Sequence, residues 1–177
     1  MSRYFPLFLD ISNKKINVYG AGRIASRRVG TLLAFAPLLT VFAPEASEGI
    51  LEAAEEGRLI YKKESYRRGS IGADVFLVLA ATDEDSVNEE ICRECRSKGI
   101  LVNVCSDRTL CDFQFPGIAA KGDLVVGINA GGMDHHMAKT WTDRIRKEVE
   151  EDGYDNQTET ASDDGKSEKD GAGDQNG

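Results

Sequence analysis

The 177-residue sequence has no uninterrupted apolar run near the length of about 20 residues that crosses a lipid bilayer. Its first fifteen residues also lack the order of charged, apolar and small residues that marks a secretory signal. Only four cysteines are present, and without a signal they indicate a reducing compartment. These absences predict a cytoplasmic protein that has no contact with a membrane.

An excess of positive charge is also absent. The net charge is −8, and most of it belongs to residues 151–177, where nine acidic residues accompany two lysines. The rest of the chain is close to neutral, which gives no support to nucleic-acid binding. Residues 152–177 are rich in Gly, Ser, Asp and Asn and have almost nothing to bury, so we expect a disordered acidic tail there.

The strongest local signal is a glycine turn between a short strand and a helix. A β-type run over 16–19 is followed by Gly20-Ala21-Gly22 and then by a helical segment over 24–34. A strand, the motif G-x-G-x-x-A and a helix, in this order, form the first unit of a dinucleotide-binding fold. Gly20 permits the tight turn, Gly22 has no Cβ to block a pyrophosphate, and the helix N-terminus offers free N–H groups to the phosphates.

Strands and helices alternate along the rest of the first 112 residues. We expect strands over 38–42, 59–61, 75–80 and 100–104, and helices over 47–56 and 82–98. Ser47 is expected to cap the first of these helices, and Thr82 with Asp85 resembles a capping box for the second. Alternation of this length predicts an α/β fold of the Rossmann type, with a doubly wound parallel sheet.

Ligands of such folds bind at the carboxyl ends of the strands, which share one edge of the sheet. The residues that follow the strands are therefore the predicted cofactor-binding residues: Gly20, Ala21, Gly22, Arg23, Ile24, Ala43, Pro44, Glu45, Ala81, Thr82, Asp83 and Asn103. Glu45 lies where this fold places its ribose-binding residue, and its carboxylate would repel a 2′-phosphate, which favours NAD over NADP. The alternative for Glu45 is an acid that only stabilises the first turn of a helix.

The pattern changes after residue 112. Phe113, Phe115 and Pro116, followed by an apolar run over 124–129, suggest two strands outside the repeat, and a helix is expected from about residue 134 to 151. Such a short segment cannot form an independent core, so it should pack on the first domain or on another subunit. The predicted organisation is a Rossmann domain over 1–112, a small α+β dimerisation segment over 113–151 and the tail over 152–177.

Several short motifs follow one another in this chain. They are Tyr4-Phe-Pro-Leu-Phe-Leu9, Gly20-Ala-Gly22-x-x-Ala-x-Arg-Arg28, Val41-x-Ala-Pro-Glu45, Ala80-Ala-Thr-Asp83, Leu101-Val-Asn-Val104, Phe113-x-Phe-Pro116 and Gly131-Gly132. Together they resemble precorrin-2 dehydrogenase, the amino-terminal domain of siroheme synthase. The resemblance implies NAD-dependent oxidation of precorrin-2 to sirohydrochlorin in siroheme biosynthesis, with Fe(II) insertion in some members. It also implies homodimers that intertwine through the segment after the dinucleotide-binding domain.

The resemblance draws attention to one acidic residue. Members of the family often have Asn-Val-Val-Asp, whose aspartate is implicated in catalysis, whereas here Ser106 occupies that position and Asp107 follows. We expect Asp107 to be the catalytic residue, accepting a proton or orienting the ring. Its alternative role is to cap the turn at Arg108-Thr109. The alternative for the whole protein is a catalytically inactive NAD(H)-binding regulatory module.

Other polar residues have simpler interpretations. Cys92 and Cys95 have helical spacing, which does not form the turn that zinc sites use, so they are interpreted as buried thiols, and no metal site is predicted. Arg27 and Arg28 are interpreted as solvated helix residues. The family's substrate has eight carboxylates, which makes the basic residues near the crevice candidate contacts: Arg23, Arg108, Lys121 and Lys139.

Overall fold

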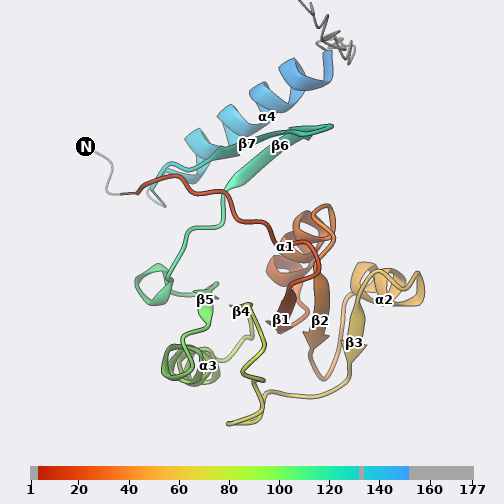
Figure 1. Cartoon of the computed structure of the whole chain (residues 1–177), viewed down its shortest axis with the longest axis vertical. Coiled ribbons are helices and arrows are strands. Elements are labelled where there is room, and N and C mark those ends of the chain that lie inside the picture. The colour runs from red at the N-terminus through yellow and green to blue at the C-terminus, as the bar shows by residue number, and fades with distance from the viewer. Residues whose placement is uncertain (1–3, 132–133, 152–177) are drawn as a thin grey trace, which may run out of the picture.

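The computed structural model describes residues 4–131 and 134–151, so the predicted acidic tail lies outside the described residues. One sheet has five strands and a second has two (Figure 1). The elements in chain order are β1 (Lys15–Tyr19), α1 (Arg23–Leu33), β2 (Leu38–Phe42), α2 (Glu48–Glu55), β3 (Ile60–Lys62), β4 (Leu77–Ala80), α3 (Asp85–Ser97), β5 (Leu101–Val104), the 3₁₀ turn η1 (Arg108–Leu110), β6 (Gly117–Lys121), β7 (Leu124–Ile128) and α4 (His135–Glu151).

The five-stranded sheet is parallel throughout and has the order β3-β2-β1-β4-β5. The chain moves outward from β1 to β3, then returns to the other side of β1 for β4 and β5. This order is that of the first five strands of a doubly wound dinucleotide-binding fold, with its switch point between β1 and β4. The predicted α/β fold of the Rossmann type is therefore confirmed.

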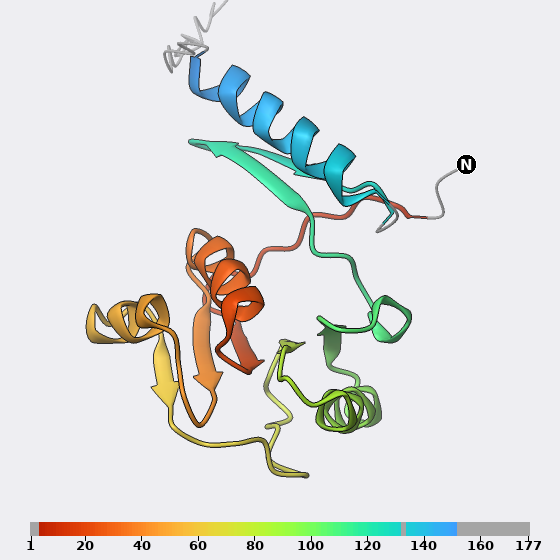
Figure 2. The same cartoon turned by 180° about the vertical axis from the view of Figure 1, so that it is seen from behind.

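Helices cover both faces of this sheet (Figure 2). On one face, Val18 and Val41 pack with Ala25 of α1 and Ile50 of α2. On the other face, the core includes Tyr19, Val78 and Val102 from the sheet and Ile91, Cys92 and Cys95 from α3. Burial from both sides explains the unbroken apolar run of β4, since a parallel strand has no solvated face. None of the described helices is both long and apolar enough to cross a membrane.

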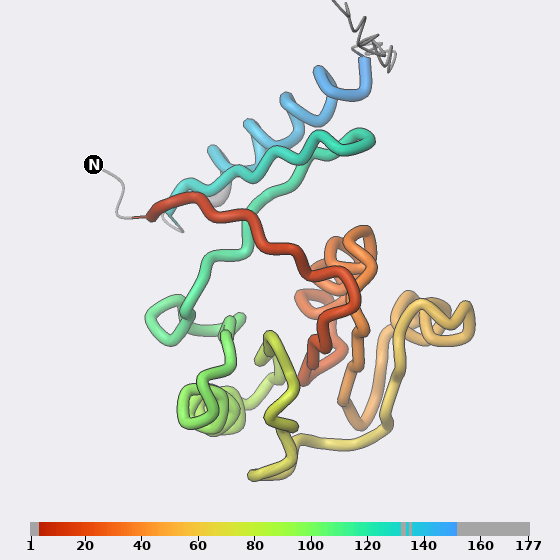
Figure 3. Tube along the Cα trace, in the orientation of Figure 1, coloured from red at the N-terminus to blue at the C-terminus, as the bar shows by residue number. Residues whose placement is uncertain are grey.

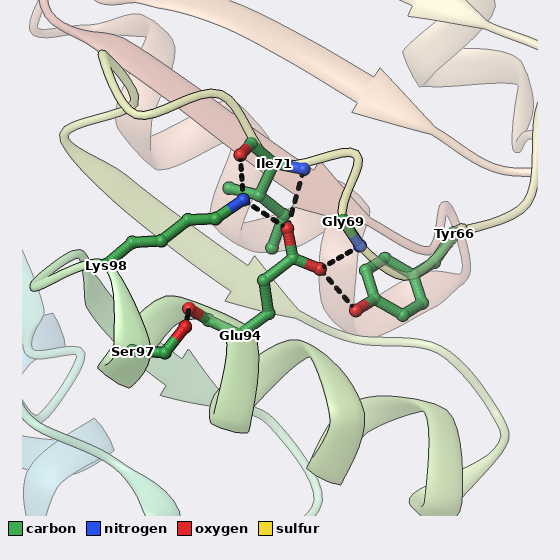
Figure 4. Close-up of polar contacts among 6 residues, drawn as sticks. All are labelled: Tyr66, Gly69, Ile71, Glu94, Ser97 and Lys98. Carbon is green, nitrogen blue, oxygen red and sulfur yellow. Dashed lines mark hydrogen bonds and ion pairs between the residues drawn. The ribbon is translucent and has the colours of Figure 1, made fainter.

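The connection between β3 and β4, residues 63–76, contains no helix and is held by one carboxylate of α3 (Figure 4). Glu94 accepts hydrogen bonds at Oε2 from the Tyr66 hydroxyl (2.6 Å) and the Gly69 N–H (2.7 Å). Its Oε1 accepts from the Ile71 N–H (2.9 Å) and the Lys98 ammonium (2.7 Å). Burial of Glu94 alone would raise its pKa, but these hydrogen bonds outweigh burial and lower the pKa to about 2.

The segment after residue 112 forms a separate layer of the β6–β7 hairpin and α4 (Figure 1). The first of its strands begins at Gly117, so the prediction of a strand at Phe113 and Phe115 is wrong. Those residues lie in an extended connection, and strand pairing starts only after Pro116, which has no N–H to donate. A Cβ at Gly117 would overlap the Thr142 hydroxyl, so this glycine allows α4 to approach β6 closely.

Neither of the two predicted side-chain cap hydrogen bonds forms. The residue at the N-cap of α3 is Glu84, and the Thr82 hydroxyl instead contacts Asn88 Oδ1 (2.8 Å). Ser47 occupies the N-cap position of α2, but its hydroxyl bonds to the Ser26 hydroxyl (2.7 Å) rather than to the helix. The Ser47 hydroxyl bonds to a residue of α1, and the Thr82 hydroxyl bonds to a side chain of α3, so neither makes the expected contact with its helix backbone.

Candidate functional site

The turn after β1 is fixed by its neighbours in the sheet. The Gly20 N–H donates to the Phe42 carbonyl (2.8 Å), and the Ala81 N–H donates to the Tyr19 carbonyl (2.8 Å). Gly20 has a φ of +101°, and a Cβ there would overlap the Ala81 carbonyl oxygen. Only glycine fits this position, because both the backbone conformation and the close approach of β4 exclude a side chain.

Gly22 differs from Gly20 because nothing in the protein requires a glycine there. Its φ is −75°, and a Cβ would meet no atom within 4 Å. It is the N-cap of α1, which has no side-chain cap and no acidic residue in its first turn. The first N–H groups of α1 therefore face open space, as a phosphate site requires. Ala25, one turn further, is buried and allows α1 to pack closely on the sheet.

The loops after β2 and β4 lie at the same edge of the sheet as this turn. Ala43 is buried and its N–H donates to the Lys62 carbonyl (3.2 Å), while Pro44 and Glu45 are exposed. The Ser47 N–H donates to the Ala21 carbonyl (3.3 Å), which joins the loop to the glycine turn. After β4, Ala81 and Thr82 are half-buried and Asp83 is exposed. The predicted cofactor residues of these three loops are thus neighbours, although their contacts with a cofactor stay a prediction.

Asn103 is placed differently from the other predicted cofactor residues. It lies within β5 with 3% of its surface exposed. Its Oδ1 accepts a hydrogen bond from the Arg28 guanidinium, and its Nδ2 donates to the Phe113 carbonyl (2.8 Å). Both ends of the Asn103 amide therefore have protein partners. This residue joins α1 to the connection that leads into β6.

A cavity of about 1370 Å³ lies between the layer of the five-stranded sheet and the C-terminal layer. Its walls come from one side of α1, the residues after β5, the β6–β7 hairpin and α4. Among the predicted site residues, Arg23, Ile24, Asn103 and Asp107 line it. The trace of the N-terminal residues runs from the hairpin toward the sheet (Figure 3). Because Arg23 and Ile24 line the cavity, it adjoins the start of α1, where the glycine turn ends.

Basic side chains outnumber acidic ones on the cavity wall. The acidic ones are Asp107, Asp134 and Asp143. The basic ones are Arg23, Arg27, Arg28, Arg108, Lys139 and Arg146. Such a surface favours a ligand with several negative charges. Lys121, the remaining predicted contact, lies on β6 but is not among the lining residues.

A family model described as "Putative NAD(P)-binding" matches residues 7–117, more than half of the chain. The chain belongs to this NAD(P)-binding family. Curated relatives support the resemblance to siroheme synthase. The chain is 35% identical over 144 residues to a probable multifunctional siroheme biosynthesis protein HemA from Ruminiclostridium josui, a match that covers 81% of this chain and 28% of the relative. It is 37% identical over 133 residues to the siroheme synthase of Nitrosospira multiformis, covering 73% and 28%.

The curated relatives are much longer than the region of them that aligns with this chain. The chain spans less than a third of the length of these curated relatives. Among solved structures, SirC, a precorrin-2 dehydrogenase, has the same fold with a TM-score of 0.67 at 24% identity. That match covers 83% of this chain and 74% of SirC. The shared fold therefore extends beyond the family model into the C-terminal layer.

Asp107 caps the 3₁₀ turn in this family member. Its Oδ1 accepts hydrogen bonds from the Thr109 hydroxyl (2.7 Å) and the Thr109 N–H (2.7 Å). These two bonds hold the pKa of Asp107 below its usual range. The capping role that the sequence left open is therefore present. Asp107 still lines the cavity, and Ser106 beside it contacts the Asn88 amide (3.4 Å).

The sequence interpretation missed the role of Arg28, and its description as a solvated residue is wrong. The guanidinium contacts Asn103 Oδ1 and Cys105 Sγ (2.8 Å), and it stacks over the Phe115 ring at 5.2 Å. Arg28 thereby connects α1, the end of β5 and the connection to β6. The available signal was the pair of arginines beside an apolar helix face, since an arginine can cover an aromatic ring and still donate hydrogen bonds.

The described cysteines do not form a metal site. Cys92 and Cys95 are buried in α3, and Cys105 and Cys111 lie at the end of β5 and after η1. All four are free thiols. Among the described residues, no group of three or more His, Cys, Asp and Glu side chains could hold a metal ion.

Proposed function

We propose that this protein oxidises precorrin-2 to sirohydrochlorin with NAD⁺ as the acceptor, in siroheme biosynthesis. One observation supports this most directly. Helix α1 has an open N-terminus behind Gly22, suited to a dinucleotide phosphate, and its flank forms a wall of the basic cavity. A dinucleotide and a polyanionic substrate would therefore bind to adjacent parts of one helix. The names of the relatives fit such a pair of ligands.

The residues of the glycine turn fit a bound dinucleotide. Gly20 sets the turn, Gly22 leaves the space beside the first N–H groups of α1, and that end of the helix has no competing acid. When bound, NAD⁺ accepts the two electrons of the oxidation as a hydride, and one proton is released to solvent or a base. Glu45, exposed after β2, would accept hydrogen bonds from the ribose hydroxyls and repel a 2′-phosphate, which is our reason for NAD over NADP.

Asp107 is our candidate for the group that accepts the released proton or orients the ring. It lines the cavity near the end of β5, its carboxylate is ionised at neutral pH, and the Thr109 bonds lower its pKa further. A carboxylate with a low pKa is a weak base, so its contribution should be modest. This same observation favours the second candidate function, a catalytically inactive NAD(H)-binding module in which Asp107 serves only as a cap.

We also propose that the protein is a homodimer assembled through residues 113–151. That segment buries few apolar side chains of its own, so its exposed ones would be covered by a second copy. The four free thiols fit a reducing compartment, and we propose that the reaction takes place in the cytoplasm.

An anaerobic assay tests the proposal. Purified protein is mixed with precorrin-2 and NAD⁺, and NADH formation is measured together with the spectrum of sirohydrochlorin. Catalytic turnover is the expected result. Binding of NAD⁺ without turnover would instead support the inactive module. Adding Fe(II) after the oxidation tests whether the protein also forms siroheme. Some members of the family that this sequence resembles have that activity.

A further inference from the structure

Helix α1 has positive charges that the protein leaves uncompensated. Arg23 and Arg27 are four residues apart, so they project from the same side of the helix, and α1 contains no acidic residue. Like charges at this spacing repel one another and destabilise a helix. Both side chains are exposed, and within residues 4–131 and 134–151 neither has a hydrogen bond or ion pair. Arg28, beside them, is held by Asn103 and Phe115.

The acidic side chains of the cavity do not compensate this pair. Asp107 accepts its hydrogen bonds from Thr109. Asp134 accepts from the Met137 N–H (2.7 Å), and Asp143 forms ion pairs with Lys139 and Arg146 on α4. Arg23 and Arg27 line the same cavity of about 1370 Å³ and lack such partners. Their charge is therefore available to an anion that enters the cavity.

We propose that Arg27, together with Arg23, binds the acidic side chains of a tetrapyrrole in this cavity and selects for their number. The inference rests on the proposed function and names residues that recognise its substrate. A guanidinium binds a carboxylate through two parallel hydrogen bonds, and two arginines one turn apart can bind neighbouring carboxylates of one ring. Arg23 also lies at the start of α1, next to the dinucleotide site. Arg27, about 6 Å further along the helix, would contact the tetrapyrrole and not the dinucleotide.

Two stable porphyrins provide probes that need no turnover. Uroporphyrin has eight carboxylates and coproporphyrin has four, and the binding of each to the full chain is followed by fluorescence. We expect Arg27→Gln to weaken uroporphyrin binding by about tenfold, as for a lost charged hydrogen bond, and to change NAD⁺ affinity much less, since NAD⁺ makes no direct contact with Arg27 in the proposed arrangement. Arg27→Lys should restore part of the affinity, because it keeps the charge but not the planar fork. The ratio of the affinity for uroporphyrin to the affinity for coproporphyrin should be smaller in Arg27→Gln than in the wild type.

Arg93→Gln is the matched control, since Arg93 is exposed on α3 and does not line the cavity. It should change uroporphyrin affinity by less than about twofold, as a distant surface charge does. The inference is overturned if Arg27→Gln binds uroporphyrin as tightly as the wild type, or if the wild type does not bind it.

Turnover of precorrin-2 separates this inference from the proposed function. In an active enzyme, Arg27→Gln should raise the KM for precorrin-2 about tenfold with little change in kcat, because the contact is made before and during the reaction. An unchanged KM would contradict the role of Arg27 and leave the proposed function standing. If the protein binds uroporphyrin through Arg27 but never oxidises precorrin-2, the role of Arg27 stands and the proposed function is contradicted.

Discussion

The first 112 residues and the segment 113–151 bury their apolar side chains to very different extents. Among the described residues, the fully buried apolar side chains lie in the first region, with the single exception of Ala119. In the second region, Leu124, Met137 and Trp141 are about half exposed. The first region therefore has a core that can fold by itself, whereas the second is an apolar layer that still needs a covering surface. Variants that affect only one region can test this difference.

The largest effect is expected at Gly20 in the first region. Gly20→Ala would place a Cβ against the Ala81 carbonyl oxygen at a positive φ, so we expect a loss of more than about 3 kcal/mol in unfolding free energy. Chemical denaturation measures it. Gly22→Asp is the matched variant, because a Cβ at this position meets no protein atom within 4 Å. It should leave stability nearly unchanged and abolish NAD⁺ binding, and unchanged NAD⁺ affinity would contradict the nucleotide site.

A second large effect is expected at the carboxylate that holds the β3–β4 connection. Glu94→Gln would turn an amide N–H₂ group toward donors that now meet a carboxylate, which should cost about 2–3 kcal/mol of unfolding free energy. The control is Glu89→Gln, an exposed residue of the same helix, with an expected change below about 0.5 kcal/mol. Equal stability of the two variants would mean that the Glu94 contacts contribute nothing.

The same residue predicts a pH dependence. The pKa of Glu94 is about 2 in the folded protein, against an ordinary value of 4.5. A lowered folded-state pKa stabilises the protein above the unfolded pKa, and this stabilisation disappears as the pH falls through the folded value. Wild-type stability should therefore decline between pH 4.5 and about 2. The difference between wild type and Glu94→Gln should shrink over that range, which denaturation at several pH values can follow.

In the second region, Gly117→Ala should have a smaller and local effect. The new Cβ would overlap the Thr142 hydroxyl, forcing α4 away from β6 at a cost of about 1–2 kcal/mol. Hydrogen exchange should increase in α4 and β6, and light scattering should report a weaker dimer. Adding Thr142→Ala should recover much of the loss. Faster exchange in β1 or β4 would show that the two regions do not behave separately.

Asp107→Asn affects the reaction rather than the fold. Asparagine still offers an oxygen to Thr109, so the cap should remain while the charge is lost. We expect turnover to fall about tenfold or more with NAD⁺ affinity little changed. Ser106→Ala should have less effect. A wild-type rate for Asp107→Asn across pH 6–9 would leave Asp107 with only its structural role.

The smallest effect is expected from deleting residues 152–177. Their composition offers little apolar surface, so stability, dimer formation and activity should change little, with unfolding free energy within about 0.5 kcal/mol of the full chain. Denaturation and light scattering of the two proteins provide the test. Loss of the dimer on truncation would mean that the covering surface lies in the tail.

Local patterns were sufficient to predict the Rossmann fold but not the contacts that join its parts. The turn at Gly20 and the alternation of strands and helices depend on neighbouring residues, and these were interpreted correctly. The bond from Arg28 to Asn103 joins residues 75 positions apart, and that from Glu94 to Gly69 joins residues 25 apart. No local pattern specifies such partners. Glu94 left one signal, because it shares a helix side with the apolar Ile91, which predicts a buried charge that must be paired.

Helix α1 has a thermodynamic consequence for any two ligands that bind along it. An anion at its N-terminus and another at Arg27 would be separated by about one helical turn, which is shorter than the Debye length of about 8 Å in physiological salt. Their charges would repel each other with little screening. Each ligand would therefore weaken the equilibrium affinity of the other by the same factor, and this antagonism would decrease as salt is added.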